Sequence, residues 1–261
     1  MSSYGENAVA MPAEPRKSAL WPSWQEDELR YVGPPPEEGP LPAVFYLALG
    51  ARASLEDLPL AAPAQSLALR GQRVFSLDLP LHEREADPHQ ALAHWAEQLR
   101  QGEDPLARFI EQTLRCIDAL WQEGSLSSVS LMGLSRGGLL AALVCAQSPH
   151  VRRLVAFAPL VRLAAARECS DLHPDLAMQY DLTAHATSLA DKEVAVWIGN
   201  RDHRVGTEAS FEWVSAVAEA QAHHGHRICH AELNLRPSVG LQGHGTSEES
   251  FAQGVSWICR T

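Results

Sequence analysis

A serine set between glycines is the first feature of this sequence that could carry chemistry. Residues 131–138 read Leu-Met-Gly-Leu-Ser-Arg-Gly-Gly, which places glycines two positions before and two positions after Ser135. The preceding residues have the apolar character of a buried strand, and residues 137–147 are small and apolar enough for a buried helix. A sharp strand-to-helix turn strains the serine backbone and exposes its hydroxyl. We therefore expect Ser135 to be a nucleophile, with the helix N-terminus behind it offering amides to an oxyanion.

A serine hydroxyl needs a base to take its proton and a carboxylate to orient that base. The chain has 12 histidines, so residue type alone does not select the base. Where such a serine lies between a strand and a helix of a parallel α/β sheet, the three residues follow one another along the chain as nucleophile, acid and histidine. Each of them comes after a strand. Asp202 follows the apolar run 194–198, and His244 lies between two glycines before the last helical pattern. We therefore expect Asp202 to be the orienting acid and His244 the base.

Other acids and histidines fit these roles less well. His203 is a neighbour of Asp202 and belongs to the same loop. Three further aspartates lie in the irregular segment 162–191, which is expected to be less rigid: Asp171, Asp175 and Asp181.

Four histidines near the end of the chain could instead bind a metal: His223, His224, His226 and His230. They span a helix end, a turn and a strand, without a recognised metal-ligand spacing. A solvated helix C-terminus, where histidine is favoured, is the simpler interpretation. We expect no metal site.

Apolar runs alternate with helical patterns from residue 43 onward. The sequence predicts strands at 43–49, 73–79, 129–132, 154–158, 194–198 and 227–235, and helices at 105–123, 137–147, 208–223 and 247–260. Runs that are apolar on both faces suit parallel strands covered by helices on each side. The alternation therefore predicts an α/β fold with a mostly parallel sheet.

The chain divides into an arm and one domain. Seven prolines fall within residues 1–40, which cannot sustain a helix or a central strand. Trp21 and Trp24 are large apolar side chains, so we expect part of this arm to pack on the body or on a partner subunit. Residues 41–261 hold all three catalytic candidates and form one domain, in which residues 162–191 are a small lid insertion.

Composition and charge argue against several classes of protein. Of the 261 residues, 46% are hydrophobic and 20% are charged, which is ordinary for a globular chain with a large core. The 21 basic and 32 acidic residues give a net charge of −11, which argues against binding to nucleic acids or anionic membranes. The five cysteines include no CxxC pair, and no secretory signal or membrane-spanning stretch is evident. We therefore expect a cytoplasmic protein with free thiols.

The motifs around Ser135, Asp202 and His244 together resemble those of the α/β-hydrolase superfamily. Within it, small esterases akin to dienelactone hydrolases and the catalytic domains of prolyl-oligopeptidase-like enzymes are the most similar. The resemblance covers roughly residues 40–261. It implies a mostly parallel sheet of about eight strands with helices on both faces, and a triad of these three residues.

The same resemblance implies an oxyanion hole formed by two backbone amides. One amide belongs to the residue after the nucleophile, here Arg136. The other follows the first long strand, which points to Ala51 by position. Relatives usually carry His-Gly there, whereas this sequence has Leu49-Gly50.

The expected function is hydrolysis of a small carboxylic ester through an acyl-enzyme, with no cofactor. A thioesterase or a short-peptide hydrolase would use the same triad, but peptidases of this type usually add a large N-terminal propeller, which forty Pro-rich residues cannot form. A non-catalytic binding scaffold is the alternative from another class, and the complete triad argues against it. The expected partner is a small-molecule ester, and the sequence leaves a homodimer open.

The side chain of Arg136 also has two interpretations. It could contact an acidic group of the substrate, or it could form a buried ion pair with the acidic segment 77–104, which is the simpler reading. Residues 135–165 hold four arginines and no acid, so the net negative charge of the chain does not exclude an anionic small substrate.

Overall fold

The computed structural model of the chain describes residues 29–82, 87 and 90–260. Most of the Pro-rich arm, including Trp21 and Trp24, lies outside this part. The expected docking of the arm therefore falls on residues that the structure does not describe.

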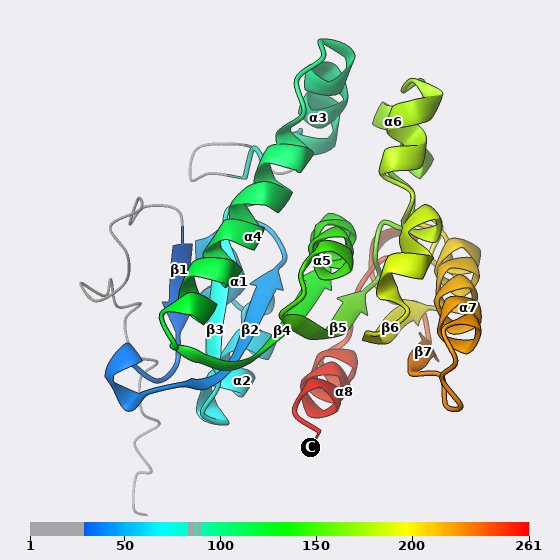
Figure 1. Cartoon of the computed structure of the whole chain (residues 1–261). Coiled ribbons are helices and arrows are strands. Elements are labelled where there is room, and N and C mark those ends of the chain that lie inside the picture. Colours follow the sequence, from blue (N-terminus) through cyan, green and yellow to red (C-terminus); the bar gives the residue numbers. More distant parts are fainter. Residues whose placement is uncertain (1–28, 83–86, 88–89, 261) are drawn as a thin grey trace, which may run out of the picture.

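Seven strands within the described residues form one sheet in the order β1-β3-β2-β4-β5-β6-β7 (Figure 1). Neighbouring strands run parallel, except that β1 is antiparallel to β3. The predicted α/β fold with a mostly parallel sheet is confirmed, with seven described strands where about eight were expected. The strands are β1 Leu29–Val32, β2 Leu41–Leu47, β3 Arg73–Leu77, β4 Leu126–Leu134, β5 Val151–Phe157, β6 Glu193–Gly199 and β7 Ala231–Arg236.

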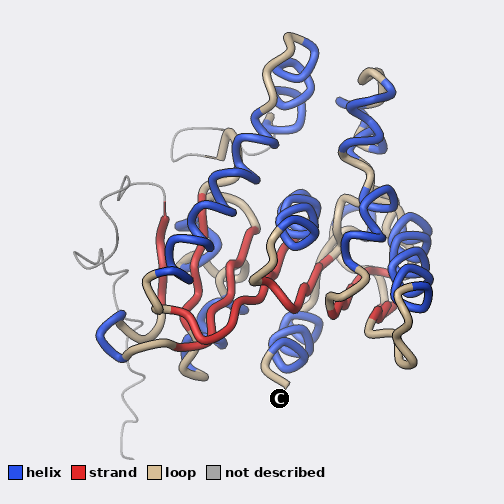
Figure 2. The backbone as a smooth tube through the Cα atoms, viewed as in Figure 1, coloured by secondary structure: helices blue, strands red, loops and turns tan. Residues whose placement is uncertain are grey.

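Helices cover both faces of the sheet (Figure 2). The first face packs against α3 (Ala91–Arg100), α4 (Pro105–Gln122), α5 (Arg136–Gln147) and α7 (Thr207–His223). The second face packs against α1 (Ala51–Leu55), α2 (Ala62–Leu69) and α8 (Glu248–Ile258).

Strands β2 to β6 are mostly buried on both faces, because their side chains alternate between two faces that helices cover. Phe45 of β2 and Phe75 of β3 stack on the first face with ring centroids 5.1 Å apart. Val44 and Tyr46, their neighbours along β2, belong to the core on the second face and are fully buried. This two-sided burial explains why the strands read as continuous apolar runs.

Side chains cap the starts of two of the predicted helices. Asp104 precedes α4, and its carboxylate accepts a hydrogen bond of 2.9 Å from the Ala107 amide, with Pro105 as the first helical residue. Ser247 precedes α8, and its hydroxyl accepts a bond of 3.2 Å from the Ser250 amide. Helix α4 therefore begins at the predicted residue, and α8 begins one residue later than predicted.

The insertion after β5 consists of short helical pieces joined by turns. These are the 3-10 turns Leu163–Ala165, Arg167–Cys169 and Leu182–Leu189, and the helix α6 (Pro174–Gln179). The Tyr180 hydroxyl donates a bond of 2.6 Å to the Asp104 carboxylate, and Arg100 lies 2.6 Å from Asp171. The insertion is thereby fastened to the loop before α4 and to α3, beyond the carboxyl ends of the strands (Figure 1).

The last strand begins later than the sequence pattern indicated. Strand β7 starts at Ala231, whereas a strand was predicted from residue 227. Residues 227–230 are exposed and form a loop, although Ile228 and Cys229 give them an apolar character. The predicted start at residue 227 was therefore wrong by four residues.

Candidate active site

The turn between β4 and α5 holds Ser135 in a strained conformation. Ser135 has φ 55° and ψ −118°, a region that residues with a side chain rarely adopt. A Cβ atom on Gly137 would lie 2.0 Å from the Leu47 carbonyl oxygen, and one on Gly133 would lie 2.4 Å from the Gly137 carbonyl oxygen. Both glycines of the motif are therefore required by close backbone contacts, as the sequence predicted.

The backbone of Ser135 is also bound to the chain that leaves β5. Its amide donates a hydrogen bond of 2.8 Å to the Phe157 carbonyl. Its carbonyl accepts bonds of 3.0 Å from the Leu160 amide and 2.9 Å from the Gly138 amide. These bonds oppose relaxation of the strained turn and fix the position of the hydroxyl.

The structure brings Ser135, His244 and Asp202 into one hydrogen-bonded chain. The distance from Ser135 Oγ to His244 Nε2 is 2.9 Å, and that from His244 Nδ1 to Asp202 Oδ2 is 2.8 Å. A carboxylate only accepts hydrogen bonds, so Nδ1 carries the proton and Nε2 is left to accept from the serine hydroxyl. This tautomer is the one that a base for Ser135 requires.

Burial and hydrogen bonding act in opposite directions on Asp202. Its side chain is fully buried, which by itself raises the pKa of the carboxyl. The hydrogen bond from His244 and those from the Val205 and Arg204 amides outweigh burial and hold this pKa below its usual range. Asp202 is therefore ionised at neutral pH and can stabilise a positively charged imidazole.

The loop that carries His244 packs directly on the loop that carries Asp202. A Cβ atom on Gly243, which has φ 75°, would lie 2.3 Å from the Arg201 carbonyl oxygen. The His203 amide donates a bond of 2.9 Å to the Gln242 carbonyl. The glycine before His244 is thus needed for the approach of these two loops.

The competing acids and histidine do not join this chain. Asp171 pairs with Arg100 at 2.6 Å, and Asp181 pairs with Arg162 at 3.0 Å. Asp175 is 94% exposed, and the His203 side chain is exposed as well.

The cluster of four histidines spans the end of α7 and the exposed loop that follows. Two of the rings, those of His224 and His226, stack with centroids 5.7 Å apart. Within residues 29–82, 87 and 90–260, no three His, Cys, Asp or Glu side chains gather as a metal ion would require.

The two expected oxyanion donors lie in different environments. Arg136 is the first residue of α5, and the amides of a first helical turn have no partner within their own helix. The Ala51 amide, in contrast, donates a hydrogen bond of 2.5 Å to Asp78 Oδ1. The role of Ala51 as a donor therefore stays a prediction, because its N–H already has a charged acceptor.

Asp78 is a residue of this site that the sequence reasoning missed. It follows β3 directly, and β3 lies beside β2, whose exit carries Ala51. An acid placed right after a buried strand is the signal that could have drawn attention to it.

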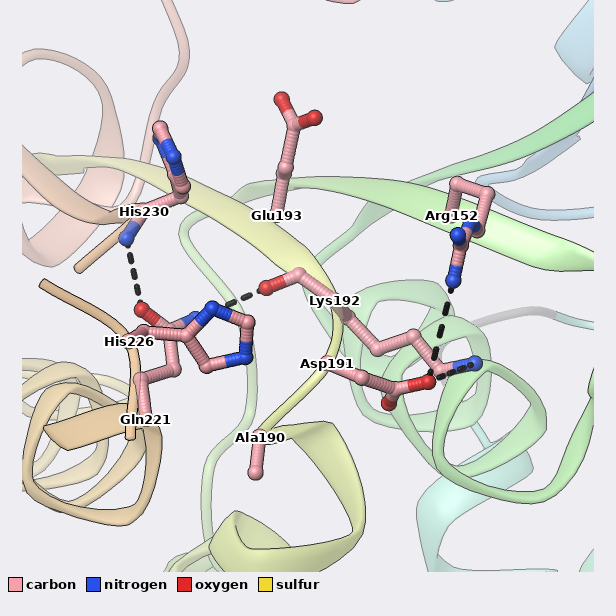
Figure 3. Close-up of a pocket in the computed structure, with 8 residues that line it drawn as sticks. All are labelled: Arg152, Ala190, Asp191, Lys192, Glu193, Gln221, His226 and His230. Atoms are coloured by element: carbon pink, nitrogen blue, oxygen red, sulfur yellow. Dashed lines mark hydrogen bonds and ion pairs between the residues drawn. The ribbon is translucent and has the colours of Figure 1, made fainter. Parts of the chain in front are cut away.

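A polar pocket lies at the opposite edge of the sheet, near the amino ends of β5 and β6 (Figure 3). It has a volume of about 240 Å³. The buried Lys192 ammonium group already donates to the Ser148 carbonyl at 3.1 Å. The Gln221 side-chain amide donates to the Lys192 carbonyl and accepts a hydrogen bond from the His230 backbone amide. Its lining residues are Arg152, Ala190, Asp191, Lys192, Glu193, Gln221, His226 and His230.

No protein-family model and no curated protein matches this sequence. Among solved structures, TT1662 from Thermus thermophilus is similar with a TM-score of 0.68 at 19% identity, over 88% of this chain and 91% of that chain. A proposed dienelactone hydrolase from Klebsiella pneumoniae has a TM-score of 0.60 at 18% identity, over 88% and 90% of the two chains. The esterase Pf2001 from Pyrococcus furiosus has a TM-score of 0.62 at 15% identity, over 88% and 85%.

These likenesses show that the chain has the α/β-hydrolase fold, as the motifs predicted. At identities below 20% they show the fold and leave substrate and activity open. A separate observation concerns membranes: none of the helices in the described residues is long and apolar enough to span one.

Proposed function

We propose that this protein is a serine hydrolase that cleaves small carboxylic esters. The observation that carries the proposal is the chain of hydrogen bonds from Ser135 Oγ through His244 to Asp202, with distances of 2.9 Å and 2.8 Å. A nucleophile, a base and an orienting carboxylate in this order are what acyl transfer requires. The esterases among the fold neighbours support the same reaction class by analogy.

In the first half of the reaction, Ser135 Oγ attacks the ester carbonyl carbon and its proton passes to His244 Nε2. Asp202 stabilises the resulting imidazolium through Nδ1. The carbonyl oxygen becomes an oxyanion, which would accept a hydrogen bond from the Arg136 amide at the start of α5. The alcohol then leaves with the proton from Nε2, and the acyl group stays on Ser135.

In the second half, water replaces the alcohol. His244 Nε2 takes a proton from the water, which attacks the acyl carbon, and the same proton returns to Ser135 Oγ as the acid leaves.

The proposal is tested by active-site labelling and turnover. A fluorophosphonate probe is expected to label the wild-type protein, and 4-nitrophenyl acetate and butyrate are expected to be hydrolysed. Ser135→Ala should abolish labelling and lower kcat by roughly 10⁶-fold. Ser128→Ala, an exposed serine at the other end of β4, is the matched control and should behave as wild type.

The same assay separates the alternatives. Acyl-CoA thioesters and aminoacyl-naphthylamides are tested beside the esters, and a higher kcat/KM on either class would assign a thioesterase or a peptidase instead. Absence of labelling, or labelling that survives in Ser135→Ala, would contradict a serine hydrolase and favour a binding scaffold.

A further inference from the structure

Strand β7 lies at one edge of the sheet, and among the described residues only β6 pairs with it (Figure 1). The carbonyls of His230 and Arg236 accept hydrogen bonds of 2.8 Å and 2.7 Å from amides at the start and just past the end of β6. In a strand, the N–H and C=O groups of one residue point to the same side, and that side alternates along the chain. The backbone groups of Ala231, Leu233 and Leu235 therefore point away from β6, toward the open edge.

Large apolar side chains are exposed along this edge. Leu235 in β7 is 53% exposed, and so are Ile228 in the loop before the strand and Val239 and Leu241 in the loop after it, to similar or differing degrees. Leu233 shares a face with Leu235 and packs partly against the core. An edge strand with exposed apolar residues is a template for pairing with another strand, and neighbouring apolar side chains mark an interaction surface.

The opposite face of β7 carries charges of both signs. The Glu232 carboxylate accepts a hydrogen bond of 2.9 Å from Arg260, which follows α8. Arg236 donates to the side chain of Gln253 in α8, and no acid in the part of the chain that the structure describes forms an ion pair with it. The edge thus presents a glutamate and, four residues later, an arginine without an acidic partner.

We propose that β7 pairs antiparallel with β7 of a second copy of this chain, with Asn234 on the two-fold axis. This register sets Leu233 opposite Leu235 of the second copy, and the outward N–H and C=O groups of these two residues bond each other. It also sets Glu232 opposite Arg236 of the second copy. Because the two-fold axis repeats every contact, the dimer holds two such leucine pairs and two such ion pairs.

Neighbouring registers fit less well. With Leu235 on the axis, Leu233 would face Pro237 of the second copy, which has no N–H group to donate. With Leu233 on the axis, Glu232 would face Asn234 and the opposite charges would no longer be paired. Only the register centred on Asn234 pairs both the charges and the leucines.

The same register brings the exposed apolar residues of the flanking loops together. In an antiparallel pair, the loop before β7 of one copy runs beside the loop after β7 of the other. Ile228 of one copy then comes near Val239 and Leu241 of the second copy. The dimer would remove from water the apolar side chains that one copy leaves exposed, which is a driving force for association. This inference does not depend on the proposed ester hydrolysis.

The first test is the mass of the full chain in solution, measured by light scattering over micromolar concentrations with a reducing agent present. The wild-type protein is expected to reach twice its chain mass of 28.5 kDa. Leu235→Lys should be a monomer at concentrations where the wild type is a dimer, because a lysine on an edge strand opposes pairing. Leu69→Lys, at an exposed leucine that ends α2, is the matched control and should remain a dimer.

Charge reversal tests the register. Glu232→Arg and Arg236→Glu should each raise the Kd of the dimer by about 100-fold or more, because each sets like charges opposite each other at two places. An equimolar mixture of the two variants should dimerise again, since every such contact then joins opposite charges. Each chain in the mixture keeps its own changed contacts with Arg260 or Gln253, so the recovery reports pairing between copies.

A cross-link tests the position of the axis. Two residues that face each other there without hydrogen bonds have Cα atoms about 4.5 Å apart, within the range of a disulfide. Asn234→Cys in a Cys229→Ser background, which removes an exposed thiol, should form a disulfide between copies under mild oxidation. Leu235→Cys in the same background faces residue 233 instead and should cross-link far less.

Three results would overturn the inference. A wild-type protein that is a monomer at every concentration is the first, and a lower Tm of Leu235→Lys in that case would show that a segment of the same chain covers the edge. The second is a dimer that survives in both Leu235→Lys and Glu232→Arg, which would place the interface elsewhere. The third is an equimolar mixture that stays monomeric together with an Asn234→Cys variant that does not cross-link. Circular dichroism shows that each variant is folded.

Discussion

The Ala51 amide donates a hydrogen bond of 2.5 Å to Asp78 Oδ1, and this bond joins the turns that follow two neighbouring strands. A second bond of 3.2 Å, from the Leu79 amide to the Leu49 carbonyl, holds the same two turns together. The Asp78 carboxylate and a tetrahedral oxyanion carry charges of the same sign. An oxyanion at the Ala51 amide would therefore compete with Asp78 for one N–H group.

Asp78→Asn is expected to raise kcat for ester hydrolysis by about tenfold. The asparagine oxygen is a neutral and therefore weaker acceptor than the carboxylate, so it competes less well with an oxyanion for the Ala51 N–H group. The measurement is kcat on a neutral 4-nitrophenyl ester. Asp175→Asn, at a 94% exposed carboxylate, is the control. A kcat that falls or stays the same would remove Ala51 from the oxyanion hole.

Ser135→Gly is expected to be more stable than Ser135→Ala by roughly 1 kcal/mol, which corresponds to a Tm higher by about 2–4 °C. Both variants lose the hydroxyl and its bond to His244, so the comparison isolates the Cβ atom. Glycine adopts φ 55° without strain, whereas alanine does not. Thermal unfolding of the two purified variants measures the difference, and equal Tm values would mean that the turn stores no strain.

His82 should make the protein less stable in mild acid. Burial, and to a smaller degree the nearby charge of Arg136, lower the pKa of His82 to about 4. Between about pH 4 and 6.5 the unfolded chain binds a proton at this histidine and the folded protein does not, so the free energy of unfolding rises with pH over this range. The effect amounts to at most about 3 kcal/mol.

His82→Phe is expected to remove that part of the pH dependence. Urea unfolding at pH 4.5 and pH 7 gives the change in unfolding free energy for each protein. His94→Phe, at an exposed histidine of α3, is the control and should keep the wild-type difference. An unchanged difference in His82→Phe would contradict the assignment.

Asp202→Asn is expected to lower kcat by roughly 10⁴-fold, because an amide cannot hold His244 in the required tautomer or stabilise the imidazolium. Asp171→Asn removes a competing acid of the insertion that pairs with Arg100 on the surface, and it should change kcat by about twofold or less. Steady-state kinetics of both variants on one ester show which of the two aspartates kcat depends on. A larger loss in Asp171→Asn than in Asp202→Asn would reassign the acid.

The parts of the fold that the sequence predicted are those with a local signal. The apolar runs of β2 to β6 and the helical patterns of α4 and α8 each depend on residues close together in the chain. Strand β1 has only four residues, and its neighbours are the prolines at 34–36, so no periodicity identified it. It is fixed by antiparallel pairing with β3, a contact between segments more than forty residues apart.

The candidate site likewise has residues that the sequence predicted and contacts that it did not. Ser135, Asp202 and His244 could be proposed because each follows a strand, and parallel strands bring their carboxyl ends to one edge. The bond between Ala51 and Asp78 could not be proposed, because it depends on how two turns dock and each turn has several polar atoms.

The bonds that hold the nucleophile end before the insertion begins. Ser135 is bonded to Phe157 and Leu160, and the insertion starts at residue 162. A different segment could therefore replace residues 162–191, between β5 and β6, without a change in any of these contacts. This insertion can diverge in evolution, or be exchanged by an engineer, while the nucleophile keeps its geometry.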